Sequence, residues 1–201
     1  MTRETPDGPP VDHPAEAELF HGALVCDLVL PARFEAGEHP LMLTRSEALL
    51  HGLAVAEDMR SDAADDERGN VELPHAIQRV EAKLDLILNL LSRLARDRQG
   101  TLVPCPVRWS HRGIRLDLPT APPPAPADQA GILALQPADW LSDHIELPVR
   151  VLAEQPGSGG LHHLWLVFGT LTAGLEDALE RHLFRLHRRQ IAEARLAANN
   201  K

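Results

Sequence analysis

The stretch "VPCPVRWSHRGIRLDL", residues 103–118, decides the fold class, because it holds two strand-like runs joined by a short turn. The first run, "TLVPCPVRWS", extends over residues 101–110 and the second, "GIRLDL", over residues 113–118, and Ser110 and Gly113 delimit the turn between them. Short apolar runs bounded by turn residues are typical of β-strands. We therefore expect two neighbouring antiparallel strands here.

Three further strand-like runs follow toward the C-terminus, at residues 131–136, 145–153 and 161–171. Turn material separates them, including "PTAPPPAPADQ" at 119–129 and "EQPGSGG" at 154–160. Several short strands with polar turns predict an antiparallel sheet or barrel. The expected fold class is α+β, with an antiparallel β-barrel followed by a C-terminal helix.

The last helix is predicted from "GLEDALERHLFRLHRRQIAEARLA", residues 174–197. Its helically spaced leucines should pack on the sheet; they are Leu175, Leu179, Leu183 and Leu186. A basic face of the same helix would meet an acidic partner, nucleic acid or, more simply, acidic side chains of its own helix. That face consists of Arg181, Arg185, Arg188, Arg189 and Arg195, and the acidic side chains are Glu176, Asp177 and Glu180.

Four segments organise the chain. They are an acidic, Pro-rich tail without fixed structure at 1–17, a strand and a helix packed on the core at 18–70, a heptad-repeat oligomerisation helix at 71–99, and the barrel with its C-terminal helix at 100–197. In the second segment we expect a strand from His21 to Leu30, stopped by Pro31, and a helix from about Ser46 to Arg60.

The third segment contains "ELPHAIQRVEAKLDLILNLLSRLARD", residues 72–97, whose apolar side chains alternate at spacings of 4 and 3 residues. This heptad period predicts helices that supercoil around one another. The repeat consists of Leu73, Ile77, Val80, Leu84, Ile87, Leu91 and Leu94. Because β-branched Val80 and Ile87 at d positions favour more than two strands, we expect a homotetramer through residues 73–98. The alternatives are a trimer, a dimer, or an amphipathic helix that packs on the chain's own barrel. The sequence leaves open whether the helices of the assembly run parallel or antiparallel.

Composition and charge disfavour several classes of protein. The net charge is -9 and aromatic residues make up 3%, which disfavours nucleic acid, since its binding relies on Lys and Arg. Cys26 and Cys105 are too few for a disulfide scaffold and are expected to be buried apolar groups. No signal peptide or membrane-length apolar run is visible, so we expect a cytoplasmic protein without membrane insertion.

The barrel pattern, the Ser110-x-x-Gly113 turn and the terminal helix together resemble a PilZ domain, a bacterial family of cyclic di-GMP receptors. Residues 73–98 resemble the heptad-repeat helix of the long-helix, tetrameric members of that family. The resemblance covers most of residues 73–195 and a first strand near residues 21–30. It implies a PilZ-like barrel joined to a coiled-coil tetramer.

PilZ domains commonly bind cyclic di-GMP through an RxxxR segment before the first barrel strand and a (D/N)xSxxG turn. Here the turn reads "RWSHRG": Ser110 and Gly113 match, Arg108 replaces the acid or amide, and no such Arg pair precedes Thr101. The resemblance leaves four degenerate ligand-binding candidates, Arg108, Ser110, Arg112 and Gly113. Each hydrogen bond from a missing guanidinium group would contribute about 1.5 to 3 kcal/mol, so we expect ligand binding to be lost.

Catalysis and metal binding have no recognisable motif in the sequence. The 11 His residues include no HxH or HExxH spacing, and no strained nucleophile elbow surrounds Ser110. We therefore expect no enzymatic activity, no cofactor and no metal.

The resemblance implies a non-enzymatic adaptor that contacts a protein partner, still to be identified, in bacterial motility, pilus or virulence signalling. Four copies held together would gain avidity for a multimeric target. The alternative is a cyclic di-GMP-binding receptor with non-standard contacts, and a third hypothesis is a nucleic-acid-binding regulator.

Overall fold

The computed structural model describes residues 13–37, 43–66, 102–122, 126–138, 140–141 and 143–199. The expected heptad helix, residues 73–98, and most of the expected acidic tail lie outside these residues, so both stay predictions. Among the described residues, no helix is long and apolar enough to cross a membrane.

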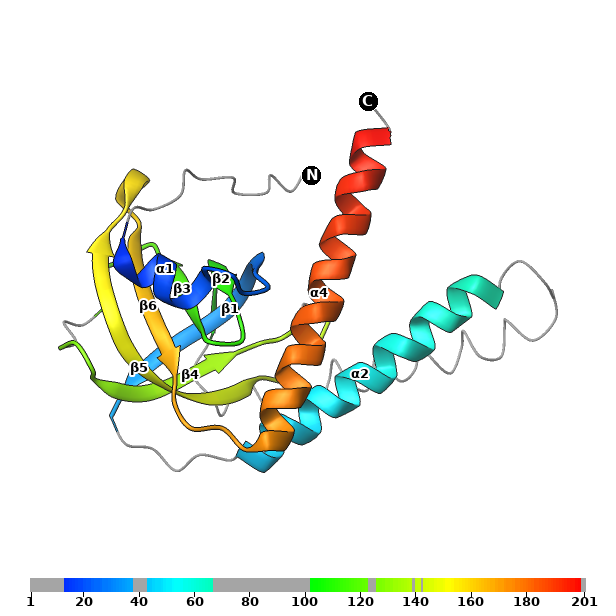
Figure 1. The fold of residues 1–201 in the computed structure, drawn as a ribbon, viewed down its shortest axis with the longest axis horizontal. Coiled ribbons are helices and arrows are strands. Elements are labelled where there is room, and N and C mark those ends of the chain that lie inside the picture. Colours follow the sequence, from blue (N-terminus) through cyan, green and yellow to red (C-terminus); the bar gives the residue numbers. More distant parts are fainter. Residues whose placement is uncertain are drawn as a thin grey trace.

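The described strands close into an antiparallel barrel in the order β1-β2-β3-β6-β5-β4 (Figure 1). They are β1 (Cys26–Ala36), β2 (Val103–Trp109), β3 (Gly113–Leu118), β4 (Ala130–Leu135), β5 (Ile145–Pro156) and β6 (His162–Phe168), with a short 3-10 helix, η1 (Ser158–Gly160), between β5 and β6. The expected antiparallel barrel is confirmed, and β2 and β3 pair across the turn predicted at Ser110 and Gly113.

Alternate side chains of each strand point into the barrel, and β3 shows why its sequence suits this position. Ile114 and Leu116 point inward and are fully buried, whereas Arg115 and Asp117 lie on the outer face. Period-2 alternation of this kind gives a strand one apolar and one polar face. Burial of each large apolar side chain contributes about 1.5 to 3 kcal/mol, so the inward residues hold the barrel together.

Helix α4 (Ala173–Asn199) packs on the barrel through the predicted leucine stripe and then projects beyond the strands (Figure 1). The exposed fractions of Leu175, Leu179, Leu183 and Leu186 are 0%, 1%, 2% and 6%. The expected packing of this helix is therefore confirmed.

Helix α2 (Leu43–Asp66) is longer than the expected Ser46–Arg60 helix and crosses α4 (Figure 1). The helix continues through the polar residues 61–66, which contain neither Gly nor Pro and therefore do not stop it. Glu57 of α2 joins the two helices by ion pairs with Arg185 and Arg189 of α4, at 3.1 and 2.8 Å. The expectation that these arginines pair with acids of their own helix is wrong for both.

Strand β1 also differs from its expected bounds, because it begins at Cys26 and continues through Pro31 to Ala36. Pro31 lies where β1 changes partner: residues up to Ala32 pair with β2, and those from Ala32 onward pair with β4. A proline lacks the backbone N–H, so it is tolerated where a strand pairing ends. The prediction that Pro31 stops the strand is therefore wrong.

Candidate functional site

Helix α1 (Pro14–Phe20) lies on the outside of the barrel, against β6 (Figure 1). It includes residues 14–17, which we expected to lack fixed structure. Pro14 occupies the first turn, where no N–H is needed, and the His13 ring caps the helix by accepting a hydrogen bond from the Ala15 N–H at 3.1 Å. The helix buries Ala15, Leu19 and Phe20 on a cluster that includes the fully buried Trp165. A seven-residue helix is unstable alone, so this packing explains why it forms.

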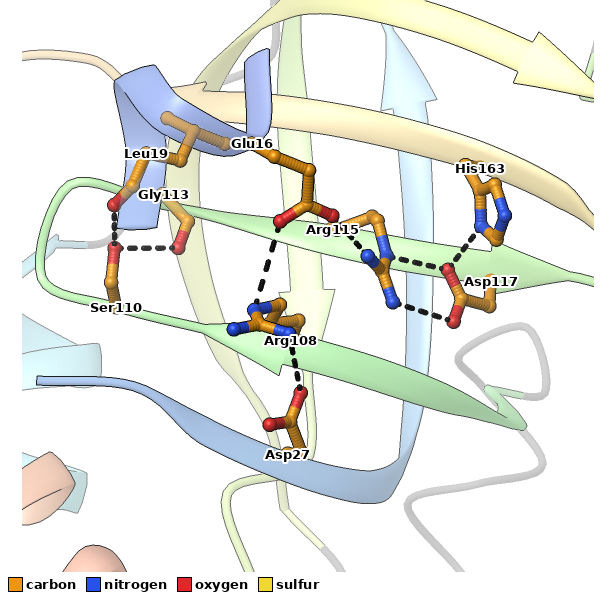
Figure 2. Close-up of polar contacts among 9 residues, drawn as sticks. All are labelled: Glu16, Leu19, Asp27, Arg108, Ser110, Gly113, Arg115, Asp117 and His163. Atoms are coloured by element: carbon orange, nitrogen blue, oxygen red, sulfur yellow. Dashed lines mark hydrogen bonds and ion pairs between the residues drawn. The ribbon is translucent and has the colours of Figure 1, made fainter. Parts of the chain in front are cut away.

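The Ser110 hydroxyl is fully buried beneath α1 (Figure 2). It donates a hydrogen bond to the Leu19 carbonyl oxygen at 2.8 Å and accepts one from the Arg112 N–H at 3.1 Å. A hydroxyl has a single proton to donate. With that proton given to Leu19, Ser110 has none left for a ligand while α1 is in place.

Gly113 begins β3 at a point of close approach between three segments. A Cβ atom placed there would lie 2.2 Å from the Leu166 carbonyl oxygen and 2.9 Å from a methyl carbon of Leu19. Only glycine leaves room for both neighbours. The Gly113 position therefore serves the packing of β6 and α1 on the turn.

Arg108 points toward α1 and β1 (Figure 2). Its guanidinium lies 3.7 Å from the Glu16 carboxylate and 3.9 Å from that of Asp27, and its central carbon is 5.3 Å from the centre of the Phe20 ring. Opposite charge and the ring face both attract a guanidinium. The arginine that replaces the family's acid or amide thus helps to hold the helix.

Arg112 contacts the C-terminal end of α1. Its guanidinium donates hydrogen bonds to the carbonyl oxygens of Glu18 and His21, at 3.3 and 3.2 Å. Carbonyl groups at a helix end have no partner within the helix and attract cations. All four predicted candidates, Arg108, Ser110, Arg112 and Gly113, therefore surround α1, and whether they bind a ligand stays a prediction.

A second group of charged residues lies under the first turn of α1, and the sequence analysis missed it. Arg115 bonds to Glu16 of α1 and, at 2.8 Å, to Asp117, which also contacts the His163 ring nitrogen at 2.6 Å (Figure 2). Burial alone would lower the pKa of Arg115, but its hydrogen bond to Asp117 and the charges of Asp117 and Glu16 raise that pKa above its usual value. The alternation of Arg115 and Asp117 in β3 predicts an outward polar face, but the partner from α1 is far away in the sequence.

The remaining reactive side chains are buried thiols and dispersed histidines. Cys26 and Cys105 are free and buried, and burial raises the pKa of each thiol to about 12. Both stay protonated at neutral pH, as expected for buried apolar groups. Within the described ranges, no three His, Cys, Asp or Glu residues gather as a metal site would require.

A closed antiparallel six-stranded barrel, a helix packed on it and a Ser-x-x-Gly turn between β2 and β3 define the PilZ class of domain. Comparison with known families agrees: the model of the atypical PilZ domain, described as a cyclic di-GMP receptor, matches residues 50–196. The chain belongs to this family.

A solved structure supports the same assignment. The chain is 47% identical to a pathogenic protein from Xanthomonas campestris, described as a tetrameric PilZ domain self-assembled through an unusual helical bundle. The match covers 89% of this chain and 95% of that chain, with a TM-score of 0.70. The Bacillus subtilis inhibitor of motility MotI/DgrA matches at 19% identity over 45% of this chain and 43% of its own chain. Its TM-score of 0.37 is too low to support a conclusion about this protein. Comparison with curated proteins gave no match.

Proposed function

We propose that this PilZ-domain protein is a non-enzymatic, tetrameric cytoplasmic adaptor in bacterial motility, pilus or virulence signalling, and that it has lost cyclic di-GMP binding. The single observation that carries the loss of binding is the hydrogen bond from Ser110 to the Leu19 carbonyl. The turn that would contact a nucleotide instead holds a segment of the same chain.

The free energy of displacing α1 supports this proposal. A nucleotide at the turn would have to expose Leu19 and Phe20, whose burial contributes about 1.5 to 3 kcal/mol each. It would also separate Glu16 from Arg115, whose side chains are only 15% and 12% exposed. The absence of an RxxxR segment before the barrel removes the interactions that would offset these losses.

The heptad repeat and the relative support the tetramer. The repeat at residues 73–98 exposes a continuous apolar edge unless other copies cover it. The 47% identical Xanthomonas protein is described as a tetramer built through a helical bundle. We therefore expect four copies of the barrel around a bundle of these helices.

Light scattering on the full chain tests the assembly. We expect a mass of four chains, and a mass of one chain for Leu84→Asp combined with Leu91→Asp, with the β signal in circular dichroism retained. Gln78→Asp combined with Asn89→Asp adds the same charge outside the a and d positions and should stay tetrameric. A mass of one chain in the unmutated protein would overturn the proposed assembly.

Titration calorimetry with cyclic di-GMP tests the loss of ligand binding. We expect no binding heat from the full chain. The family description, a cyclic di-GMP receptor, favours the alternative, which is a receptor with non-standard contacts. In such a receptor the nucleotide would displace α1. Micromolar binding that disappears in Ser110→Ala or Arg112→Ala would establish that alternative and defeat the adaptor-only proposal.

A further inference from the structure

An open cavity of about 450 Å³ lies between α1, the β2–β3 turn, the end of β6 and the first turns of α4. Glu18 and Leu19 of α1 and Glu176 and Glu180 of α4 form part of its lining. Because α1 supplies a wall, the cavity exists only while α1 is seated on Ser110. We call this cavity, with its continuation described below, the α1–α4 groove.

The rim of the α1–α4 groove is acidic. Glu18, Glu176 and Glu180 are exposed, and none of these three carboxylates has an ion pair or hydrogen bond among the residues that the structure describes. On the basic side, Arg112 donates its guanidinium hydrogen bonds to carbonyl groups of α1. Unpaired like charges around a concave surface attract ligands of opposite charge.

The floor of the groove is apolar and continues past the first cavity. Val167, Phe168 and Leu171 are half-buried there and leave apolar surface facing the groove. A second, shallower cavity of about 880 Å³ shares Phe168, Gly169 and Glu176 with the first and extends over β4 and β5. A groove of this extent suits a length of polypeptide better than a single small molecule.

We propose that the α1–α4 groove docks a basic segment of a partner protein, in which Lys or Arg alternates with apolar residues. This inference rests on the proposed adaptor function and names the chemistry of its partner. The aliphatic stems of Lys and Arg would lie on Phe168 and Leu171, and their charged ends would reach Glu18, Glu176 and Glu180. Nucleic acid, nucleotides and anionic lipid carry the wrong sign for this rim.

The docked basic segment comes from a different protein, because most arginines on the basic face of the chain's own helix α4 already form ion pairs. Arg181 pairs with Asp177, and Arg185 and Arg189 both pair with Glu57. These pairs would have to break before the helix could enter the groove of a second copy. Four equivalent grooves on one tetramer would bind a multimeric partner with increased avidity.

Fluorescence anisotropy with a defined probe tests this proposal on the full chain. The probe is a labelled peptide of about ten residues that alternates Leu and Arg, ~33 Å long when extended. Two matched peptides carry Glu or Gln in place of Arg. The groove variant is Glu176→Gln with Glu180→Gln, and the control variant, Glu154→Gln with Glu193→Gln, removes the same charge from exposed residues outside the groove.

We expect the Arg peptide to bind, the Glu peptide not to bind, and the groove variant to bind the Arg peptide about tenfold more weakly, since it loses two charge pairs. The control variant should change the affinity less than twofold. A photoreactive group on the Arg peptide should cross-link near residues 167–180.

Equal losses in both variants, no loss in either, or cross-links elsewhere would overturn the groove proposal. A groove variant whose mass falls below four chains would also overturn it, because the groove would then hold a second copy. These outcomes leave calorimetry with cyclic di-GMP and the mass of the unmutated chain unaffected, so they are distinct from failure of the adaptor proposal.

Discussion

The hydroxyl of Ser110 donates its hydrogen bond to the carbonyl oxygen of Leu19, across 91 residues of sequence. Ser110 is the hydroxyl residue of the turn that resembles the family's ligand motif, and Leu19 belongs to a helix that precedes the barrel. The polar groups of the turn are thus satisfied by the chain itself. This relationship makes the protein a PilZ domain whose turn anchors a helix.

Removal of the Ser110 hydroxyl should destabilise the folded chain. Ser110→Ala leaves the Leu19 carbonyl and the Arg112 N–H without this buried partner, which costs about 1 to 3 kcal/mol. Urea unfolding at fixed protein concentration measures the change. Ser158→Ala, at an exposed position in η1, is the control and should change the free energy of unfolding by less than about 0.5 kcal/mol. Equal effects of the two substitutions would contradict the role given to Ser110.

The buried ion pairs of Arg115 should matter more than a surface pair. Arg115→Gln removes the ion pair of Asp117 and leaves Glu16 with only the more distant Arg108, and loss of one partner of a buried pair costs about 3 to 5 kcal/mol. Arg150 and Asp128 form an exposed pair, with side chains 54% and 84% exposed, so Arg150→Gln should cost at most about 1 kcal/mol. Chemical denaturation of both variants compares them. If Arg150→Gln were the more damaging change, our description of the charged group under α1 would be wrong.

Two glycine substitutions should have opposite signs. Gly113→Ala places a methyl group 2.2 Å from the Leu166 carbonyl oxygen, so we expect a loss of about 1 to 3 kcal/mol or more. Gly52→Ala, in α2, meets nothing within 4 Å and should stabilise the chain by about 0.5 to 1 kcal/mol, because alanine favours helix. Thermal unfolding gives the sign of each change. A stabilising Gly113→Ala would show that β6 and α1 do not approach the turn as described.

Stability should fall in acid because of His182, which is fully buried between α4 and the barrel. Burial, followed by Arg185 and Arg189, lowers the pKa of His182 to about 4 against the opposing charge of Glu57. The unfolded chain, with a His pKa near 6.5, therefore binds more protons between these two values. The free energy of unfolding should drop by about 3 kcal/mol as pH falls from about 6.5 to about 4.

His182→Leu should flatten this part of the pH profile, since leucine takes up no proton in either state. Urea unfolding at several pH values measures the slope, and His51→Leu, at an exposed position of α2, is the control. The assignment to His182 fails if the His182→Leu variant keeps the wild-type slope of the pH profile while the His51→Leu variant loses it.

The barrel could be predicted from the sequence because its signals are local. Residues 103–118 contain two strands and their turn within one short stretch, and the leucine stripe of α4 repeats at helical spacing. The continuation of β1 through Pro31 could not be predicted in this way, because it depends on where pairing passes from β2 to β4. That change of partner involves residues about a hundred positions away.

The candidate site was only half predictable, for a related reason. The turn residues Ser110 and Gly113 stand in a recognisable motif, but their contact with α1 joins distant parts of the chain. A seven-residue helix has little intrinsic stability, so its sequence alone gives a weak signal. Helix α1 forms because Trp165 and Arg115 offer it an apolar surface and an ion pair.

Hydrogen–deuterium exchange of residues 15–20, measured on the full chain with and without excess cyclic di-GMP, tests most directly whether α1 occupies the turn in place of a ligand. We predict slow exchange throughout α1 that the nucleotide leaves unchanged. Faster exchange at residues 15–20 together with protection at residues 108–113 on addition of the nucleotide would contradict the account.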